Sequence, residues 1–148
     1  MTDFCGRLSN VLNNRPCDIE NESDYFTSAV LVPLVRQNGK LGVLFEVRSA
    51  GLNWQPGDIC FPGGRIELDD ASPQEAAIRE TREELGLPDE TIEILGPLSY
   101  MVSPIGVMLY PFAAYIRNYD LIRPNHGEVA EVFVAPLDYL LSSEPLTA

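Results

Sequence analysis

Histidine and cysteine are scarce in this sequence, and their scarcity limits the chemistry the chain can support. His126 is the single histidine, so a histidine-based metal site and a Ser-His-Asp triad are nearly excluded. The three cysteines, Cys5, Cys17 and Cys60, form an odd count without metal-type spacing. We expect incidental or buried thiols in a reduced compartment.

Positive charge and long apolar runs are also in short supply. Ten Lys and Arg residues stand against 22 Asp and Glu, which gives a net charge of −12 and a pI near 4.3. So acidic a chain is a poor partner for nucleic acid or an anionic membrane. No apolar stretch approaches the length that spans a bilayer, and the first residues do not resemble a signal peptide. We therefore expect a cytoplasmic protein whose carboxylates hold cations and whose partner is a small phosphorylated molecule.

The chain has the length and composition of one globular domain. The chain has 148 residues, 45% of them hydrophobic, which is enough to bury a sizeable core. We predict a single domain over residues 1–148, of which 1–24 form an N-terminal extension. Apolar patterning predicts helices at 4–12 and 136–141, a hairpin turn at 37–40, and strands at 26–35, 41–47, 91–101, 107–116 and up to residue 134. Pro33 predicts a strand end, bulge or edge, because proline donates no ladder hydrogen bond.

The stretch 63–87 is organised as a Gly-Gly turn, an acidic loop and a helix with both ends marked. Ser72 is followed by Pro73 at the first helical position and Glu75 at the third, which predicts the helix start. Gly86 predicts its end.

The charge pattern of this helix favours a cation site. At about 100° per residue, one arc holds Ala77, Ile78, Thr81 and Leu85, and a second arc beside it holds Glu80, Glu83 and Glu84. Like charges at i, i+4 along the edge of an apolar stripe are unfavourable unless a cation compensates them. Mg²⁺ is a natural compensator, because it takes oxygen ligands. The alternative is a solvated acidic face in which Arg79 and Glu83 form an ordinary ion pair.

The whole stretch resembles the signature of the Nudix hydrolases. Their box runs Gly, five residues, Glu, seven residues, and then Arg-Glu-aliphatic-any-Glu-Glu-any-Gly-aliphatic. Gly64 begins the match and residues 79–87 end it. Two positions depart from it: Asp70 is the first acid, with one extra residue before Arg79, and Thr81 replaces the aliphatic residue.

The preceding segment resembles an additional signature of the coenzyme A pyrophosphatase branch of that family. The positions in register are Leu44, Arg48, Ser49, Gly57, Phe61, Pro62, Gly63 and Gly64. The one-residue extension before Arg79 is also usual in that branch. Phe45, Glu46 and Asn53 are mismatches, and Asn53 stands where the branch has an Arg that could pair with a phosphate.

The resemblance implies an α/β fold, the Nudix-type α/β/α sandwich with a curved mixed sheet, and a divalent cofactor, Mg²⁺ or Mn²⁺. It implies metal ligands at Glu80, Glu83, Glu84 and the Gly63 carbonyl. Arg79 would orient Glu80 or Asp70 through an ion pair. The general base is Glu80 or Glu128 in this interpretation, with Glu131 as the alternative loop acid.

Substrate contacts are expected from the branch-specific segment. They are Arg48, Ser49, Asn53, Phe61 and Gly64. Arg48 could instead be a surface cation at a strand end, and Trp54 either stacks on a base or pantetheine or packs its own loop.

The implied activity is cleavage of the pyrophosphate of coenzyme A or an acyl derivative to 3′,5′-ADP and a phosphopantetheine product. The alternatives are a Nudix enzyme acting on ADP-ribose, dinucleotides or nucleotide triphosphates, and a non-catalytic nucleotide-binding module. Nudix proteins are often homodimers, and members of this branch usually continue beyond the point where this chain stops. We therefore expect either a short member or a truncated chain.

Overall fold

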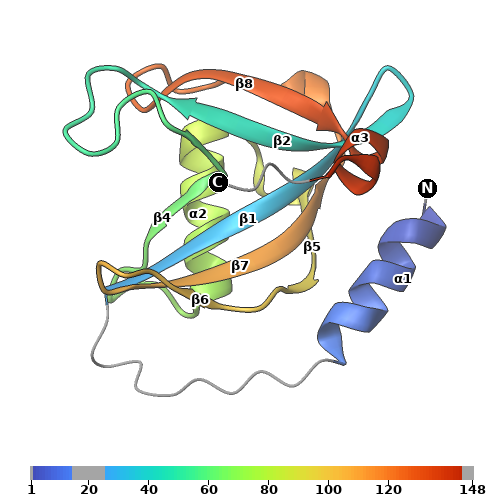
Figure 1. Ribbon diagram of the computed structural model, residues 1–148, viewed down its shortest axis with the longest axis horizontal. Helices are drawn as coiled ribbons and strands as arrows, with labels where there is room; N and C mark the ends of the chain where they lie inside the picture. Colours follow the sequence, from blue (N-terminus) through green and yellow to red (C-terminus); the bar gives the residue numbers. More distant parts are fainter. Residues whose placement is uncertain (1, 15–25, 145–148) are drawn as a thin grey trace.

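The computed structural model describes residues 2–14 and 26–144 and has one mixed sheet of eight strands at its centre (Figure 1). The strand order is β3-β2-β1-β7-β5, and β4, β6 and β8 pair with β1, β7 and β2 respectively. The strands are β1 (Phe26–Gln37), β2 (Lys40–Arg48), β3 (Ile59–Cys60), β4 (Gly63–Arg65), β5 (Ile92–Pro97), β6 (Met101–Val102), β7 (Val107–Ile116) and β8 (Val129–Pro136). The helices are α1 (Thr2–Asn13), α2 (Pro73–Leu85) and α3 (Leu137–Ser142), with single 3-10 turns η2 (Asp89–Thr91) and η3 (Tyr119–Leu121).

Helices cover both faces of this sheet. Leu31 of β1 is fully buried in the cluster that contains Ala77 of α2, whereas Leu34 packs with Cys5 and Leu12 of α1. Alternate residues of a strand point to opposite faces, so these two clusters lie on opposite sides of the sheet. Figure 1 shows α2 behind β1 and α1 beside β5. The predicted α/β/α layering and mixed sheet are confirmed.

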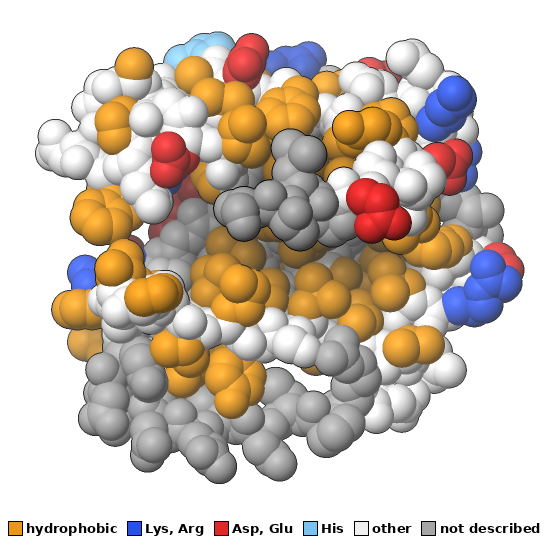
Figure 2. All heavy atoms as spheres, viewed as in Figure 1, with side chains coloured by type: hydrophobic (Ala, Val, Ile, Leu, Met, Phe, Trp, Pro, Cys, Tyr) orange, Lys and Arg blue, Asp and Glu red, His pale blue; other side chains and the backbone are white. Residues whose placement is uncertain are grey.

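The face opposite α2 is apolar at its centre. In Figure 2 hydrophobic side chains gather over the central strands, and the charged side chains in view lie mainly around the margin. Phe45 is part of the cluster on this side and stacks on Phe61 and Phe133, with ring centroids 4.9 and 5.4 Å away.

The interpretation of Pro33 as a strand end, bulge or edge was wrong. Pro33 is fully buried inside β1 and pairs with Ala114 of β7. On its other side β1 pairs with β4 as far as Val30 and with β2 only from Leu34 onward. The Leu31 N–H donates to the Pro62 carbonyl on that side, so the missing donor of Pro33 faces the gap between two partner strands.

Most predicted elements are confirmed, and one is not. The helices at 4–12 and 136–141 and the hairpin at 37–40 appear as α1, α3 and the β1–β2 turn. The single strand expected over 91–101 is wrong, because β5 ends at Pro97 after a register shift between Ile94 and Gly96. Pairing with β7 resumes only at the two residues of β6. The predicted extension at 1–24 and Cys17 lie partly or wholly outside the described residues.

Within the described part of the chain, no helix is long and apolar enough to cross a membrane.

Candidate active site

Helix α2 begins and ends where its sequence predicts. The Ser72 hydroxyl accepts a hydrogen bond from the Glu75 backbone N–H at 3.1 Å, and Pro73 occupies the first turn. Gly86 ends the helix in the left-handed region with φ 63°, and its N–H donates to the Arg82 carbonyl at 2.8 Å. These ends fix which side chains of α2 face the sheet.

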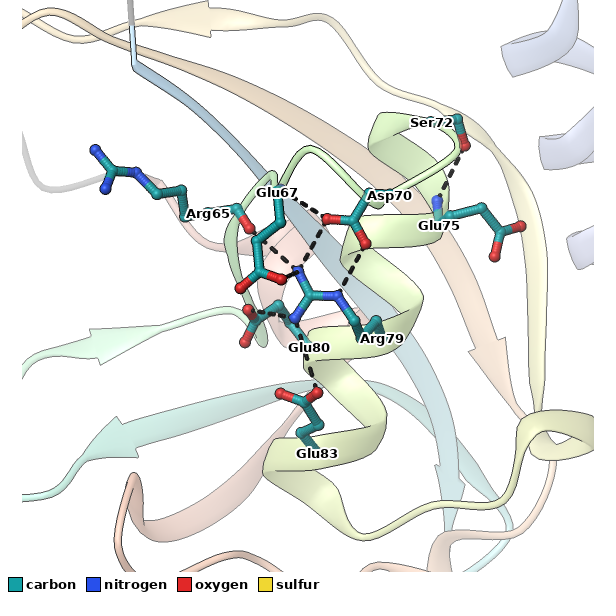
Figure 3. Close-up of polar contacts among 8 residues, drawn as sticks. All are labelled: Arg65, Glu67, Asp70, Ser72, Glu75, Arg79, Glu80 and Glu83. Atoms are coloured by element: carbon teal, nitrogen blue, oxygen red, sulfur yellow. Dashed lines mark hydrogen bonds and ion pairs between the residues drawn. The ribbon is translucent and has the colours of Figure 1, made fainter.

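Arg79 connects α2 to the acidic loop before it (Figure 3). Its Nε donates to Asp70 Oδ1 at 2.9 Å and its Nη2 to Asp70 Oδ2 at 3.0 Å. Its Nη1 donates to Glu80 Oε1 at 2.9 Å, and Glu83 lies 3.7 Å away. The predicted ion pair from Arg79 therefore reaches both Asp70 and Glu80, and Asp70 adds an acceptor for the Glu67 backbone N–H.

These contacts set the charge of the two carboxyl groups in different ways. The hydrogen bonds from Arg79 and from the Glu67 backbone lower the pKa of Asp70 to about 2. Burial raises the pKa of Glu80, although Arg79 opposes the shift. Asp70 is thus an anion that holds the guanidinium of Arg79. The pKa of Glu80 is set by two opposing effects, its burial and its hydrogen bond from Arg79.

The Gly-Gly turn, which the structure forms as the short strand β4, leaves room for these carboxylates. A Cβ on Gly64 would lie 2.6 Å from Cδ of Glu80, so only glycine fits there while Glu80 keeps its position. Gly63 and Val30 form a non-hydrogen-bonded pair of the β1–β4 ladder. The ladder hydrogen bond next to this pair runs from the Leu31 N–H to the Pro62 carbonyl. The Gly63 N–H points to Glu84 Oε2 at 3.4 Å, and its carbonyl lies on the same open edge.

Glu84 lies deeper than its neighbours on α2 and meets a carboxyl group that sequence reasoning missed. Glu84 is 7% exposed, and Glu46 of β2 is 2% exposed. The two side chains are within hydrogen-bonding reach of each other. Burial first, and then the neighbouring carboxyl group, hold the pKa of Glu84 well above its usual range, and burial also raises the pKa of Glu46. The family pattern marks Glu46 only as a mismatch, although its period-2 spacing from Leu44 predicts an inward-facing acid.

Glu83 differs from the other two acids of the helix. Its side chain is 55% exposed and contacts only Arg79 among the ion pairs seen. Among the described residues, no three His, Cys, Asp or Glu side chains already converge closely enough to form a complete metal cluster.

The donor set nonetheless fits a hard divalent cation. Buried Glu46 Oε1 has no hydrogen-bond partner. Glu84 accepts a long bond from the Gly63 N–H, and the Glu80 carboxyl group lies against Gly64. Two or three carboxylates, a backbone carbonyl and waters are the oxygen ligands that Mg²⁺ takes in proteins.

The loop that carries Glu128 is hydrogen-bonded to Glu84 of α2 and to Ser49, which follows β2. Its Asn125 N–H donates to the Glu84 carbonyl at 2.8 Å. Ser49 donates its N–H to the Glu128 carbonyl at 3.0 Å and its hydroxyl to the His126 carbonyl at 2.8 Å. The exposed carboxylate of Glu128 is close enough to contribute to the raised pKa of Glu46 and Glu80. Glu131 is exposed beside Val47.

The predicted substrate contacts divide into two groups. Arg48 lies at the end of β2, with Nε donating to the Trp54 carbonyl at 3.2 Å, and Asn53 is exposed in the same loop. Gly64 lies against Glu80.

Phe61, by contrast, packs on Phe45 in the cluster on the α1 side of the sheet, away from the carboxylates. Ser49 is buried against the loop carbonyls. No substrate role is tested by this geometry, and all five remain predictions.

Comparison with protein families identifies the family to which this fold and these carboxylates belong. The model of the NUDIX domain matches residues 25–147. The chain belongs to the Nudix family. The fold predicted from the resemblance is thereby confirmed as the Nudix fold, and Nudix proteins generally use a divalent metal.

The chain is also similar to individual proteins and solved structures. The chain is 35% identical to the mouse peroxisomal coenzyme A diphosphatase NUDT7 over 95% of this chain and 65% of that protein. It is 38% identical to the human mitochondrial coenzyme A diphosphatase NUDT8 over 80% of this chain and 51% of that protein. The chain thus spans between half and two thirds of these relatives' length. A crystal structure of the Nudix hydrolase RenU from M. smegmatis superposes with a TM-score of 0.63 at 23% identity, covering 78% of this chain and 73% of that one.

Proposed function

We propose that this chain is a metal-dependent phosphoanhydride hydrolase that cleaves the pyrophosphate of coenzyme A or an acyl-coenzyme A to 3′,5′-ADP and a phosphopantetheine product. The observation that carries the proposal is the convergence of α2 carboxylates on the Gly63–Gly64 edge, with Arg79 holding Glu80 beside it. Similarity to two named coenzyme A diphosphatases supports the choice of substrate.

The residues would divide the work as follows. Glu80, Glu83, Glu84 and the Gly63 carbonyl would hold Mg²⁺ or Mn²⁺. A bound divalent cation supplies neutralisation of phosphate oxygens and a more acidic water. Arg79 fixes the Glu80 carboxylate through its Nη1 hydrogen bond. Glu80 or Glu128 would accept the proton from the attacking water.

A groove beside this edge suits the remainder of such a substrate. It has a volume of about 560 Å³ and is lined by Trp54, the 101–105 hairpin, Val107 and Leu109. Ser28, also in its wall, pairs with Arg65, the β4 residue after Gly64, so the groove reaches β4 from the face of the sheet opposite α2. A mainly apolar groove next to a cation site can take the pantetheine arm while the pyrophosphate meets the carboxylates. Arg48, joined to the Trp54 carbonyl, lies beside the same loop and would contact a phosphate.

The direct test is a substrate panel. The purified chain is incubated with coenzyme A, 3′-dephospho-coenzyme A, ADP-ribose and a diadenosine polyphosphate, each with Mg²⁺, Mn²⁺ or EDTA, and products are resolved chromatographically. The proposal predicts metal-dependent release of 3′,5′-ADP, with coenzyme A preferred over the compound without its 3′-phosphate. Preference for ADP-ribose or a dinucleotide would overturn the substrate assignment, and no cleavage of any compound would indicate a nucleotide-binding module. A homodimer and a cytoplasmic location remain predictions.

A further inference from the structure

Glu46 is an acid inside the sheet rather than on its surface. Its strand β2 has a partner on each side, and Glu46 itself pairs with Cys60 of β3 and Val132 of β8. Leu44, two residues earlier, is buried in the cluster that contains Leu85 of α2. Because side chains at i and i+2 share a face, Glu46 points toward α2 and not toward solvent. Its 2% exposure agrees with this direction.

One oxygen of the Glu46 carboxyl group lacks the partner that burial demands, although the group lies within hydrogen-bonding reach of Glu84. Oε1 is fully buried without a hydrogen-bond partner. None of the ion pairs seen among the described residues involves Glu46 or Glu84. Burying a carboxylate is costly unless it is paired or coordinates a metal. The fold therefore places an unmet acceptor at this point.

The carboxyl group of Glu84 lies within hydrogen-bonding reach of Glu46 and offers further oxygen ligands. Glu84 approaches from α2 and also accepts a long hydrogen bond, 3.4 Å, from the Gly63 N–H. The Gly63 carbonyl lies on the same free edge of β4. We propose that Glu46 and Glu84 bind a divalent cation between them, so that β2 supplies a carboxylate ligand in addition to those of the Nudix helix. This inference rests on the proposed metal-dependent site and adds a ligand to it.

Cation binding can be measured without catalysis. Mn²⁺ binding to the substrate-free chain is followed by electron paramagnetic resonance and by calorimetric titration, for the wild type, Glu46→Gln and Glu75→Gln. Glu75→Gln is the matched control, because it removes one carboxylate from the exposed first turn of α2, where Figure 3 shows its side chain directed away from Arg79. We expect Glu46→Gln to lose one bound Mn²⁺ or to bind it about 10- to 100-fold more weakly. Glu75→Gln should match the wild type.

A thermal unfolding series separates this role from a purely structural one. If Glu46 is a ligand, Mn²⁺ raises the Tm of the wild type and of Glu75→Gln by several degrees, and the rise is largely lost in Glu46→Gln although its Tm in EDTA is unchanged or higher. Glu46→Met provides a second folded variant of similar length. Equal Mn²⁺ affinity, stoichiometry and Tm rise in wild type and the Glu46 variants would overturn the proposal, as would a wild type that binds no Mn²⁺. A chain that binds Mn²⁺ through Glu46 without cleaving coenzyme A would refute the proposed function alone.

Discussion

Arg79 holds Asp70 through two parallel hydrogen bonds, Nε to Oδ1 at 2.9 Å and Nη2 to Oδ2 at 3.0 Å. The remaining guanidinium nitrogen reaches Glu80, so one side chain joins the acidic loop to the carboxylate at the Gly64 edge. Lysine can supply the charge but not this forked geometry. Arg79→Lys should therefore lower turnover about 10- to 100-fold, as expected when a ligand loses its outer support, and steady-state kinetics measure it. Arg117→Lys, at the exposed pair with Glu93, should leave turnover within about twofold; equal losses in both variants would contradict the assignment.

The same pair predicts a pH dependence of stability. The pKa of Asp70 is about 2 in the folded chain and 3.8 without its contacts. The folded state therefore binds fewer protons than the unfolded state between these values. The stabilising contribution of Asp70 is complete above about pH 5 and is lost as the pH falls through 2. The Tm difference between wild type and Asp70→Asn should be largest at pH 5–7 and should narrow toward pH 2.5. A difference that stays constant over this range would refute the coupling.

Gly64 is predicted to be irreplaceable for activity but not for folding. The methyl group of Gly64→Ala would overlap the Glu80 carboxyl group, 2.6 Å from its Cδ, and the side chain can swing aside at little cost to the core. We expect turnover to fall by about 10²-fold, because misplacing a catalytic group by roughly 1 Å has that effect. Gly6→Ala, in α1 with no atom within 4 Å of the added methyl, is the control and should keep full activity. A fully active Gly64→Ala variant would show that Glu80 need not stay against this edge.

Ser49 is predicted to fasten the Glu128 loop. Ser49→Ala removes the 2.8 Å hydrogen bond to the His126 carbonyl from a buried position. The expected loss is about 1–3 kcal/mol of unfolding free energy, which denaturant titration measures. If Ser49 is instead a substrate contact only, the KM should rise while stability is unchanged.

The sequence was most informative where local chemistry decides the structure. Ser72, Pro73 and Gly86 act within one or two turns of α2, and all three behave as their residue types predict. The partners of Arg79 were also predictable, because Asp70 and Glu80 are close to it along the chain. Contacts between residues far apart in the sequence were harder to predict. Pro33 is tolerated in a central strand only because β1 changes partner beside it, a fact that the strand pattern does not contain.

The angles around α2 predicted which of its acids face the apolar side, but not the partner they meet there. Glu80 and Glu84 lie toward the edge of the apolar arc and Glu83 opposite it, and in the structure Glu84 is buried and Glu83 is half exposed. Glu46 is a mismatch to the family pattern, and only the alternation of residues along β2 predicts that it points inward. The packing of Phe61 on Phe45, on the α1 side of the sheet, is likewise a long-range contact that its motif does not contain.

The proposed function requires that the acids of α2 form a metal-dependent catalytic centre. The most direct measurement is the rate of 3′,5′-ADP release from coenzyme A in Mg²⁺ by the wild type, Glu83→Gln, Glu84→Gln and the control Glu75→Gln, each confirmed as folded by thermal unfolding. The account predicts that Glu83→Gln and Glu84→Gln lose about 10²-fold or more in turnover, on the scale of removing one preorganised charge-stabilising group, while Glu75→Gln matches the wild type. Unchanged turnover in both Glu83→Gln and Glu84→Gln would contradict it.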